Sequence, residues 1–144
     1  MKQQNYGNHA RLIPAFHFFL MPLALITFIA AIVYLVMAGA SGMTLFGSLI
    51  LVSLSLMAAM TMVFARRFGC MAQDRAIRAE ENLRHFALTG KLLDPRLTMG
   101  QIIALRFASD EEFVVLSEKA AGENTPPDEI KRSIKTWKAD HNRV

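Results

Sequence analysis

A stretch of 54 consecutive residues without Asp, Glu, Lys or Arg, from Leu12 to Ala65, is the feature that most constrains this 144-residue chain. All 12 carboxylates lie after it, between Asp74 and Asp140. A water-soluble domain of this size has too small an interior to cover such a long apolar segment. One helix needs only about 20 apolar residues to cross a bilayer. We therefore expect an all-α integral membrane protein with a polar C-terminal part.

The apolar stretch has to reverse direction, because a straight helix of this length would extend about 81 Å and a hydrocarbon core is about 30 Å thick. The segment Gly39-Ala40-Ser41-Gly42 supplies a short polar break. It predicts a transmembrane hairpin with spans at about residues 14–38 and 44–65. Pro22 lies inside the first span and should kink it, because the carbonyl of Phe18 loses its hydrogen-bond donor.

Basic residues flank the apolar stretch on both sides, and the loop between the spans carries no charge. The flanking residues are Lys2, Arg11, Arg66 and Arg67. The positive-inside rule then places both termini in the cytoplasm. We expect an N-terminal cytoplasmic segment (1–13), the transmembrane hairpin (14–65) and a cytoplasmic helical region (66–144). The first span is too long for the apolar core of a cleaved signal peptide, so it should remain as an anchor.

The second span is expected to continue into the cytoplasm as one long helix, because no proline or turn cluster follows Ala65 and Gly90 is a suitable C-cap. Along this helix, small and apolar residues recur at alternating four- and three-residue spacing, as in a coiled coil. We call them the packing seam: Ala58, Met62, Ala65, Gly69, Ala72, Ala76, Ala79, Leu83 and Phe86. A seam of this kind predicts a partner helix from another copy, from the chain's own C-terminal helices or from a different protein.

Four arginines close to the end of the second span form a basic cluster that predicts contact with anionic membrane lipids. They are Arg66, Arg67, Arg75 and Arg78. Each cation near an anionic lipid surface contributes about 1 kcal/mol to binding. The whole region after the apolar stretch holds 14 basic and 12 acidic residues, a balance that disfavours nucleic acid as a partner.

About three short helices should follow Gly90. Thr98 with Gln101 and Ser109 with Glu112 match the capping-box pattern, and Thr125 precedes two prolines suited to a first turn. The apolar positions of the three helices are Ile102, Ile103 and Phe107; Phe113, Leu116 and Ala120; and Ile130, Ile134 and Trp137. We expect them to pack against Leu83, Phe86, Leu92, Leu93 and Leu97 or against a neighbouring subunit.

No pattern in the sequence matches a catalytic or metal-binding motif, and the single cysteine, Cys70, excludes an intrachain disulfide. We therefore expect a non-enzymatic protein without a cofactor or metal, acting as an oligomeric scaffold or an accessory subunit of a membrane complex. Its expected partners are membrane lipids and further copies or other membrane-protein subunits. The alternative is a transport or channel component in which several copies line a pore with hydroxyl side chains. Those side chains are Thr27, Tyr34, Ser48, Ser53, Ser55 and Thr61.

Four segments outside the spans resemble a family of small two-span bacterial membrane proteins of Bacteroidetes type. They are Gln3-Gln4-Asn5-Tyr6-Gly7-Asn8-His9-Ala10-Arg11, Asp94-Pro95-Arg96-Leu97-Thr98, Ile103-Ala104-Leu105-Arg106-Phe107-Ala108-Ser109-Asp110-Glu111-Glu112, and the tail from Asp128-Glu129-Ile130-Lys131 through Trp137-Lys138-Ala139-Asp140. The resemblance covers nearly the whole chain and implies an inner-membrane location. The family is of unknown function, so the resemblance implies no catalytic residue.

Overall fold

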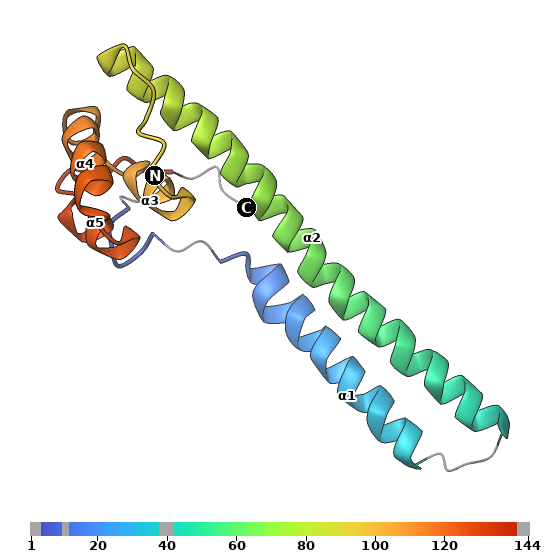
Figure 1. Cartoon of the computed structure of the whole chain (residues 1–144). Coiled ribbons are helices and arrows are strands. Elements are labelled where there is room, and N and C mark those ends of the chain that lie inside the picture. Colours follow the sequence, from blue (N-terminus) through green and yellow to red (C-terminus); the bar gives the residue numbers. More distant parts are fainter. Residues whose placement is uncertain (1–3, 10–11, 38–41, 141–144) are drawn as a thin grey trace. The chain divides into compact units, whose positions relative to one another are not determined.

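The computed structural model describes residues 4–9, 12–37 and 42–140, and within them the chain is helical without any strand. The elements are a π-helix η1 (Ala15–Leu20) and the α-helices α1 (Met21–Met37), α2 (Gly42–Thr89), α3 (Met99–Leu105), α4 (Asp110–Glu123) and α5 (Pro127–Ser133) (Figure 1). The expected break at Gly39-Ala40-Ser41 lies outside the described residues, and Gly42 already begins α2.

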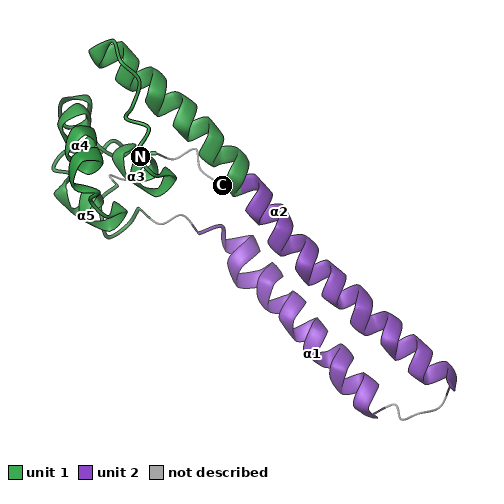
Figure 2. Cartoon of the chain, in the orientation of Figure 1, with its two compact units in different colours: residues 1–11, 70–144 green, residues 12–69 purple. Residues whose placement is uncertain are grey.

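The chain forms two compact units (Figure 2). Unit 1 contains residues 1–11 and 70–144, and unit 2 contains residues 12–69. The long helix α2 contributes to both, and its continuity from Gly42 to Thr89 agrees with the expectation that no break follows Ala65. Gly90 has a φ of 74° and ends the helix as its C-cap, as expected.

In unit 2, η1 and α1 run antiparallel beside the first half of α2. The less exposed residues recur at three- and four-residue spacing on each helix, which identifies the facing sides. They are Ala24, Phe28, Ala31 and Leu35 on α1, and Ser48, Val52, Ser55, Ala59 and Met62 on α2. Residues 15–37 and 42–89 each form a helix that is long and apolar enough, by length and composition, to cross a membrane.

The distortion expected near Pro22 takes the form of the π-helical turn η1. The N–H of Met21 donates to the carbonyl of Phe16, five residues back, in place of the usual four. Proline has no N–H to donate to Phe18, so the hydrogen-bond register before it is free to change.

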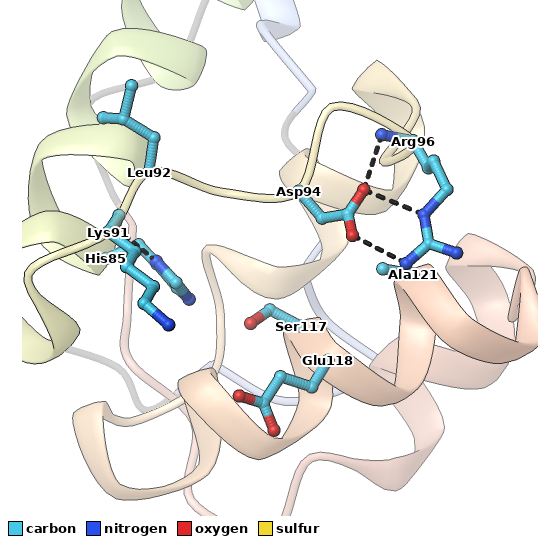
Figure 3. Close-up of a pocket in the computed structure, with 8 residues that line it drawn as sticks. All are labelled: His85, Lys91, Leu92, Asp94, Arg96, Ser117, Glu118 and Ala121. Atoms are coloured by element: carbon cyan, nitrogen blue, oxygen red, sulfur yellow. Dashed lines mark hydrogen bonds and ion pairs between the residues drawn. The ribbon is translucent and has the colours of Figure 1, made fainter.

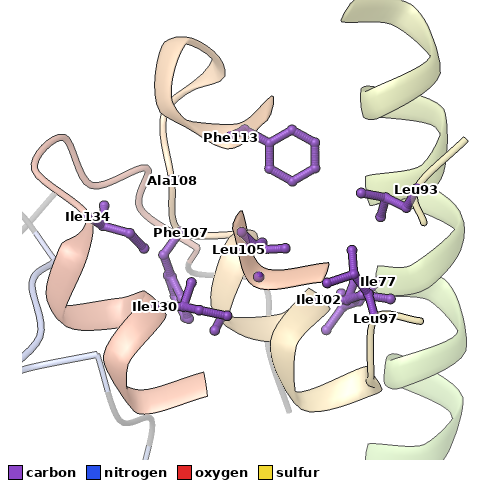
Figure 4. Packing of buried hydrophobic residues seen from close by; sticks show 12 residues of the cluster. Ile77, Leu93, Leu97, Ile102, Leu105, Phe107, Ala108, Phe113, Ile130 and Ile134 are labelled. Atoms are coloured by element: carbon purple, nitrogen blue, oxygen red, sulfur yellow. The ribbon is translucent and has the colours of Figure 1, made fainter. Parts of the chain in front are cut away.

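The core of unit 1 is built by α3, α4 and α5 on one face of α2 (Figure 4). Its largest fully buried side chains are Phe107, Phe113, Leu105 and Ile130. Leu93 and Leu97 are buried in this core, as expected. Leu83, Phe86 and Leu92 are exposed, so the expectation that the helices pack against them was wrong. The core uses Ile77 of α2, which lies on a different side of the helix.

The helix starts follow the sequence signals in part. Thr98 caps α3 with a complete capping box to Gln101. Ser109 is the N-cap of α4, but Glu112 does not close a capping box and instead accepts hydrogen bonds from the backbone N–H groups of Lys135 and Thr136. The N-cap of the last helix is Pro126, one residue later than expected.

The last helix is also shorter than its apolar spacing predicts. It ends at Ser133, so Trp137 lies beyond it. There the chain is extended and pairs with the connection between α3 and α4 through the bridge Ala108–Trp137. The N–H of Lys138 donates to the carbonyl of Phe107 at 2.8 Å. These long-range hydrogen bonds replace the helical ones that Ile130, Ile134 and Trp137 were expected to share.

The N-terminal segment belongs to unit 1, which the sequence did not predict. Gln4 exchanges two hydrogen bonds with the backbone of Asp140, at 2.8 and 3.2 Å. The ring of His9 contacts Phe107 and Trp137 at centroid distances of 5.8 and 5.9 Å. The Lys131 ammonium donates to Nε2 of His9 at 3.2 Å. The segment before the first apolar helix is therefore held by the residues at the other end of the chain.

Candidate functional site

The packing seam is largely exposed in unit 1. Leu83 is 68% exposed and Phe86 is 51% exposed, and the alanines Ala72, Ala76 and Ala79 are exposed as well. Near the start of the seam, Met62 and Gly69 are half-buried, whereas Ala58 and Ala65 are exposed. No side chain of the described part of unit 1 covers the apolar ladder that Ala72 to Phe86 form on this helix.

The chain's own C-terminal helices occupy the opposite side of α2. That side carries Ile77, Glu81 and His85, which are all buried. Ala79 and Leu83 each follow one of these buried residues by two positions, which is about 200° around a helix of 3.6 residues per turn. Among the described residues, the core of unit 1 packs on the Ile77 side of α2, and the seam residues from Ala72 to Phe86 remain exposed.

A half-buried arginine, Arg84, connects α2 to the start of α4 on the covered side. The guanidinium of Arg84 lies 2.6 Å from the Asp110 carboxylate and 3.1 Å from that of Glu81, and it donates to the carbonyl of Ala108 at 2.7 Å. Its central carbon lies 4.3 Å from the centroid of Phe113. The hydrogen bond from Arg84 lowers the pKa of Asp110. This network holds the C-terminal helices away from the seam.

The predicted basic cluster is divided between the two units. Arg67, Arg75 and Arg78 are exposed, and Arg66 is half-buried. The guanidinium carbon of Arg66 lies 5.5 Å from the centroid of the Phe16 ring, within the range of a cation–π contact. Among the four arginines, Arg66 is therefore the one that unit 2 itself positions.

Unit 2 contains a cavity of about 440 Å³ between η1–α1 and α2, which we call the interhelical cavity. Pro22 and Phe28 line it from one helix, and Ala59 and Met62 line it from the other. Its wall is apolar apart from His17. This cavity was not predicted from the sequence, although the proline inside an otherwise regular apolar helix was a signal for it.

Four of the six hydroxyl side chains that would line a pore donate hydrogen bonds to the backbone of their own helices. Thr27 donates to the carbonyl of Leu23 at 2.8 Å, and Ser48 donates to that of Thr44 at 2.8 Å. The two other bonded serines behave in the same way: Ser53 donates to Ile50, and Ser55 donates to Val52. A hydroxyl group bonded to its own backbone offers less to a permeating ion.

A second cavity, of about 280 Å³, lies in unit 1 beside the end of α2 (Figure 3). Its lining includes His85, Lys91, Ser117 and Glu118. Nδ1 of His85 lies 2.7 Å from the carbonyl of Lys91, and the Ser117 hydroxyl donates to the carbonyl of Val114. These polar residues are far apart in the sequence and come together only when α4 packs on α2.

At the rim of this second cavity, Asp94 and Arg96 form an ion pair with an N···O distance of 2.7 Å. The hydrogen bonds from Arg96 lower the pKa of Asp94 to about 2. Each charge at the rim is therefore largely neutralised by its neighbour. Nor do the described residues anywhere bring three metal-ligating side chains together.

A comparison with protein families finds that the whole chain, residues 1–144, matches DUF6526, a family of unknown function. No curated protein and no solved structure matches the chain. The comparisons thus give a family and no activity, and a role has to be inferred from the residues themselves.

Proposed function

This chain belongs to DUF6526, a family of unknown function, and we propose that it is a non-enzymatic integral protein of the bacterial inner membrane. In this proposal it acts as an oligomeric scaffold or as an accessory subunit of a membrane complex. The observation that carries the proposal is the exposed packing seam on α2, from Ala72 to Phe86, opposite a well-packed face of the same helix.

The surface of unit 2 supports the membrane location. Large apolar side chains are exposed along both of its helices; Phe18 is 68% exposed and Phe46 is 63% exposed. Soluble monomers rarely expose apolar patches beyond a few hundred Å². In a bilayer the same side chains contact lipid, and the helices satisfy their own backbone hydrogen bonds.

The docking of the N-terminal segment supports an orientation with both ends on one side. Tyr6 and His9 precede the first apolar helix, and their partners Asp128 and Lys131 follow the second. If the two apolar helices cross a membrane, contacts between these residues support an even number of crossings. The basic residues that flank the spans favour the cytoplasmic side.

The composition of the seam supports assembly through helix packing. Ala72, Ala76 and Ala79 allow two helix backbones to approach closely, and Leu83 and Phe86 supply larger apolar contacts at the far end. The first occupant that we propose is the same seam of another copy, because a self-complementary face gives a closed symmetric pair.

Native mass spectrometry of the purified chain in mild detergent tests this role. We expect oligomers of wild-type protein, and mainly monomers of Ala76→Glu, because that carboxylate would be buried without a partner in the seam. Val115→Glu is the matched control, since Val115 is exposed on α4 away from the seam. Wild-type protein that is monomeric and copurifies with no other subunit would contradict the proposal.

A further inference from the structure

The interhelical cavity has the size and lining of a ligand site. Its volume of about 440 Å³ lies within the range of roughly 300–1,000 Å³ found for small-molecule sites, which are mainly apolar with a few polar groups that fix the orientation of the ligand. Pro22 and the π-turn η1 shape one wall, and π-turns recur at functional sites.

A cationic side chain, Arg66, lies about one helical turn beyond one end of this cavity. Arg66 follows the wall residue Met62 by about one helical turn. Its guanidinium lies over the ring of Phe16, and the next residue, His17, lines the cavity. Residues 12–69 contain no Asp or Glu, so unit 2 offers Arg66 no acidic partner of its own. A half-buried arginine whose own unit offers no acidic partner favours an anionic ligand.

His17 adds a second donor to the same end. Its Nδ1 lies 3.1 Å from the backbone N and 3.0 Å from the backbone O of Ile13, so the chain holds the ring through this nitrogen. Nε2 remains for a ligand. Beside an anion the imidazole carries a hydrogen on Nε2 and donates it.

We propose that the interhelical cavity binds one anionic phospholipid, with an acyl chain between the two helices and the phosphate on Arg66 and His17. This inference rests on the membrane location proposed above. Arg66 directly follows the charge-free stretch. In the proposed membrane it would therefore lie at the depth of the lipid phosphate groups.

The charge pattern favours an anionic lipid over other occupants. Unit 2 of a second copy has no carboxylate to pair with Arg66. A zwitterionic lipid brings its own cation close to Arg66 and Arg67, which weakens its binding relative to a lipid with a net negative head group. A soluble phosphate ion would make no contact with the apolar wall of the cavity, so it would fit the site less well than a lipid.

The test is a lipid titration of the delipidated full-length chain in mild detergent, followed by native mass spectrometry. Phosphatidylglycerol should bind about tenfold more tightly than phosphatidylcholine with the same acyl chains, because it lacks the choline cation that is repelled by Arg66. Arg66→Gln should remove this preference. Arg78→Gln should keep it, because Arg78 carries the same charge but lies in unit 1. Ala59→Leu should weaken both lipids by filling the cavity, and glycerol 1-phosphate should not compete.

Equal affinity for the two lipids, or equal losses for Arg66→Gln and Arg78→Gln, would overturn the proposal in favour of diffuse attraction to basic residues. Retention of the preference by Arg66→Lys would support it and show that the variant chains fold. The same spectra count protomers. A monomer that prefers phosphatidylglycerol would support the lipid site and contradict the proposed assembly. An oligomer without this preference would support the assembly and contradict the lipid site.

Discussion

Tyr6 and Asp128, separated by 122 positions in the sequence, are joined by a hydrogen bond of 2.7 Å from the phenol to the carboxylate. Arg132 completes the contact by donating to the Tyr6 oxygen at 3.1 Å. The bond also lowers the pKa of Asp128. It connects the segment before the first apolar helix to the last helix of the chain.

Tyr6→Phe should loosen this connection without removing the ring. We expect faster hydrogen exchange at the amides of residues 4–9 and a rise in the pKa of Asp128, because the carboxylate loses its donor. Hydrogen–deuterium exchange with mass spectrometry measures the first effect. Tyr34→Phe in unit 2 is the control and should leave the exchange of residues 4–9 unchanged. Unchanged exchange in both variants would show that Tyr6 does not hold the segment.

Arg84→Met should destabilise unit 1 by about 3 kcal/mol, because it leaves the buried Glu81 carboxylate without its cation. The double variant Glu81→Met, Arg84→Met should recover part of the loss, since a buried ion pair is replaced by apolar side chains. Urea unfolding followed by the fluorescence of the single tryptophan, Trp137, measures both. A double variant less stable than the single one would contradict the role assigned to the pair.

Acid should weaken the contact between α2 and α4. Arg84 holds the pKa of Asp110 below its ordinary value of 3.8, so this carboxylate stabilises the fold above about pH 3.8 and loses that contribution as the pH falls through its lowered pKa. Unfolding measured between about pH 5 and pH 3 should show a smaller loss of stability for Asp110→Asn than for wild type. The pKa values of Asp94, Glu111 and Asp128 are also lowered, so these carboxylates should contribute to the dependence that remains. Identical acid profiles would exclude a role for Asp110.

Two glycines should respond to alanine with opposite signs. Gly90 has a φ of 74°, so Gly90→Ala should cost about 1 kcal/mol at the end of α2. Gly122 lies within α4, where an added Cβ meets no atom within 4 Å, so Gly122→Ala should stabilise by about 0.5–1 kcal/mol. The same urea unfolding assay compares them. An increased free energy of unfolding for Gly90→Ala would show that a side chain causes no backbone strain at this position.

Local signals in the sequence predicted much of the helical organisation. The uncharged stretch and the glycines after Met37 predicted two long apolar helices, and Gly90 predicted where the second one ends. The capping box at Thr98 and Gln101 was confirmed because it depends on residues only three positions apart. The pattern at Ser109 and Glu112 has the same spacing but formed no capping box, because Glu112 binds the backbone of residues 135 and 136 instead.

Long-range contacts could not be predicted in the same way. Trp137 has helical spacing with Ile130 and Ile134, but its pairing with Ala108 replaces the helix. The helical periodicity of α2 did not indicate on which side the C-terminal helices would pack. Ile77 has charged neighbours in the sequence, so its position in the core was not evident. The cavity beside His85 depends on the same packing choice. These features are decided by contacts between segments far apart in the sequence.

Disulfide cross-linking in native membranes tests the proposed pairing of seams most directly. In a Cys70→Ser background, Ala76→Cys should form a covalent dimer rapidly on mild oxidation, because symmetric packing brings the two copies of this position together. Arg78→Cys, exposed about 200° around the helix from Ala76, should not. Dimer formation by Ala76→Cys alone is the predicted result. Equal cross-linking of both positions, or of neither, would contradict assembly through the seam.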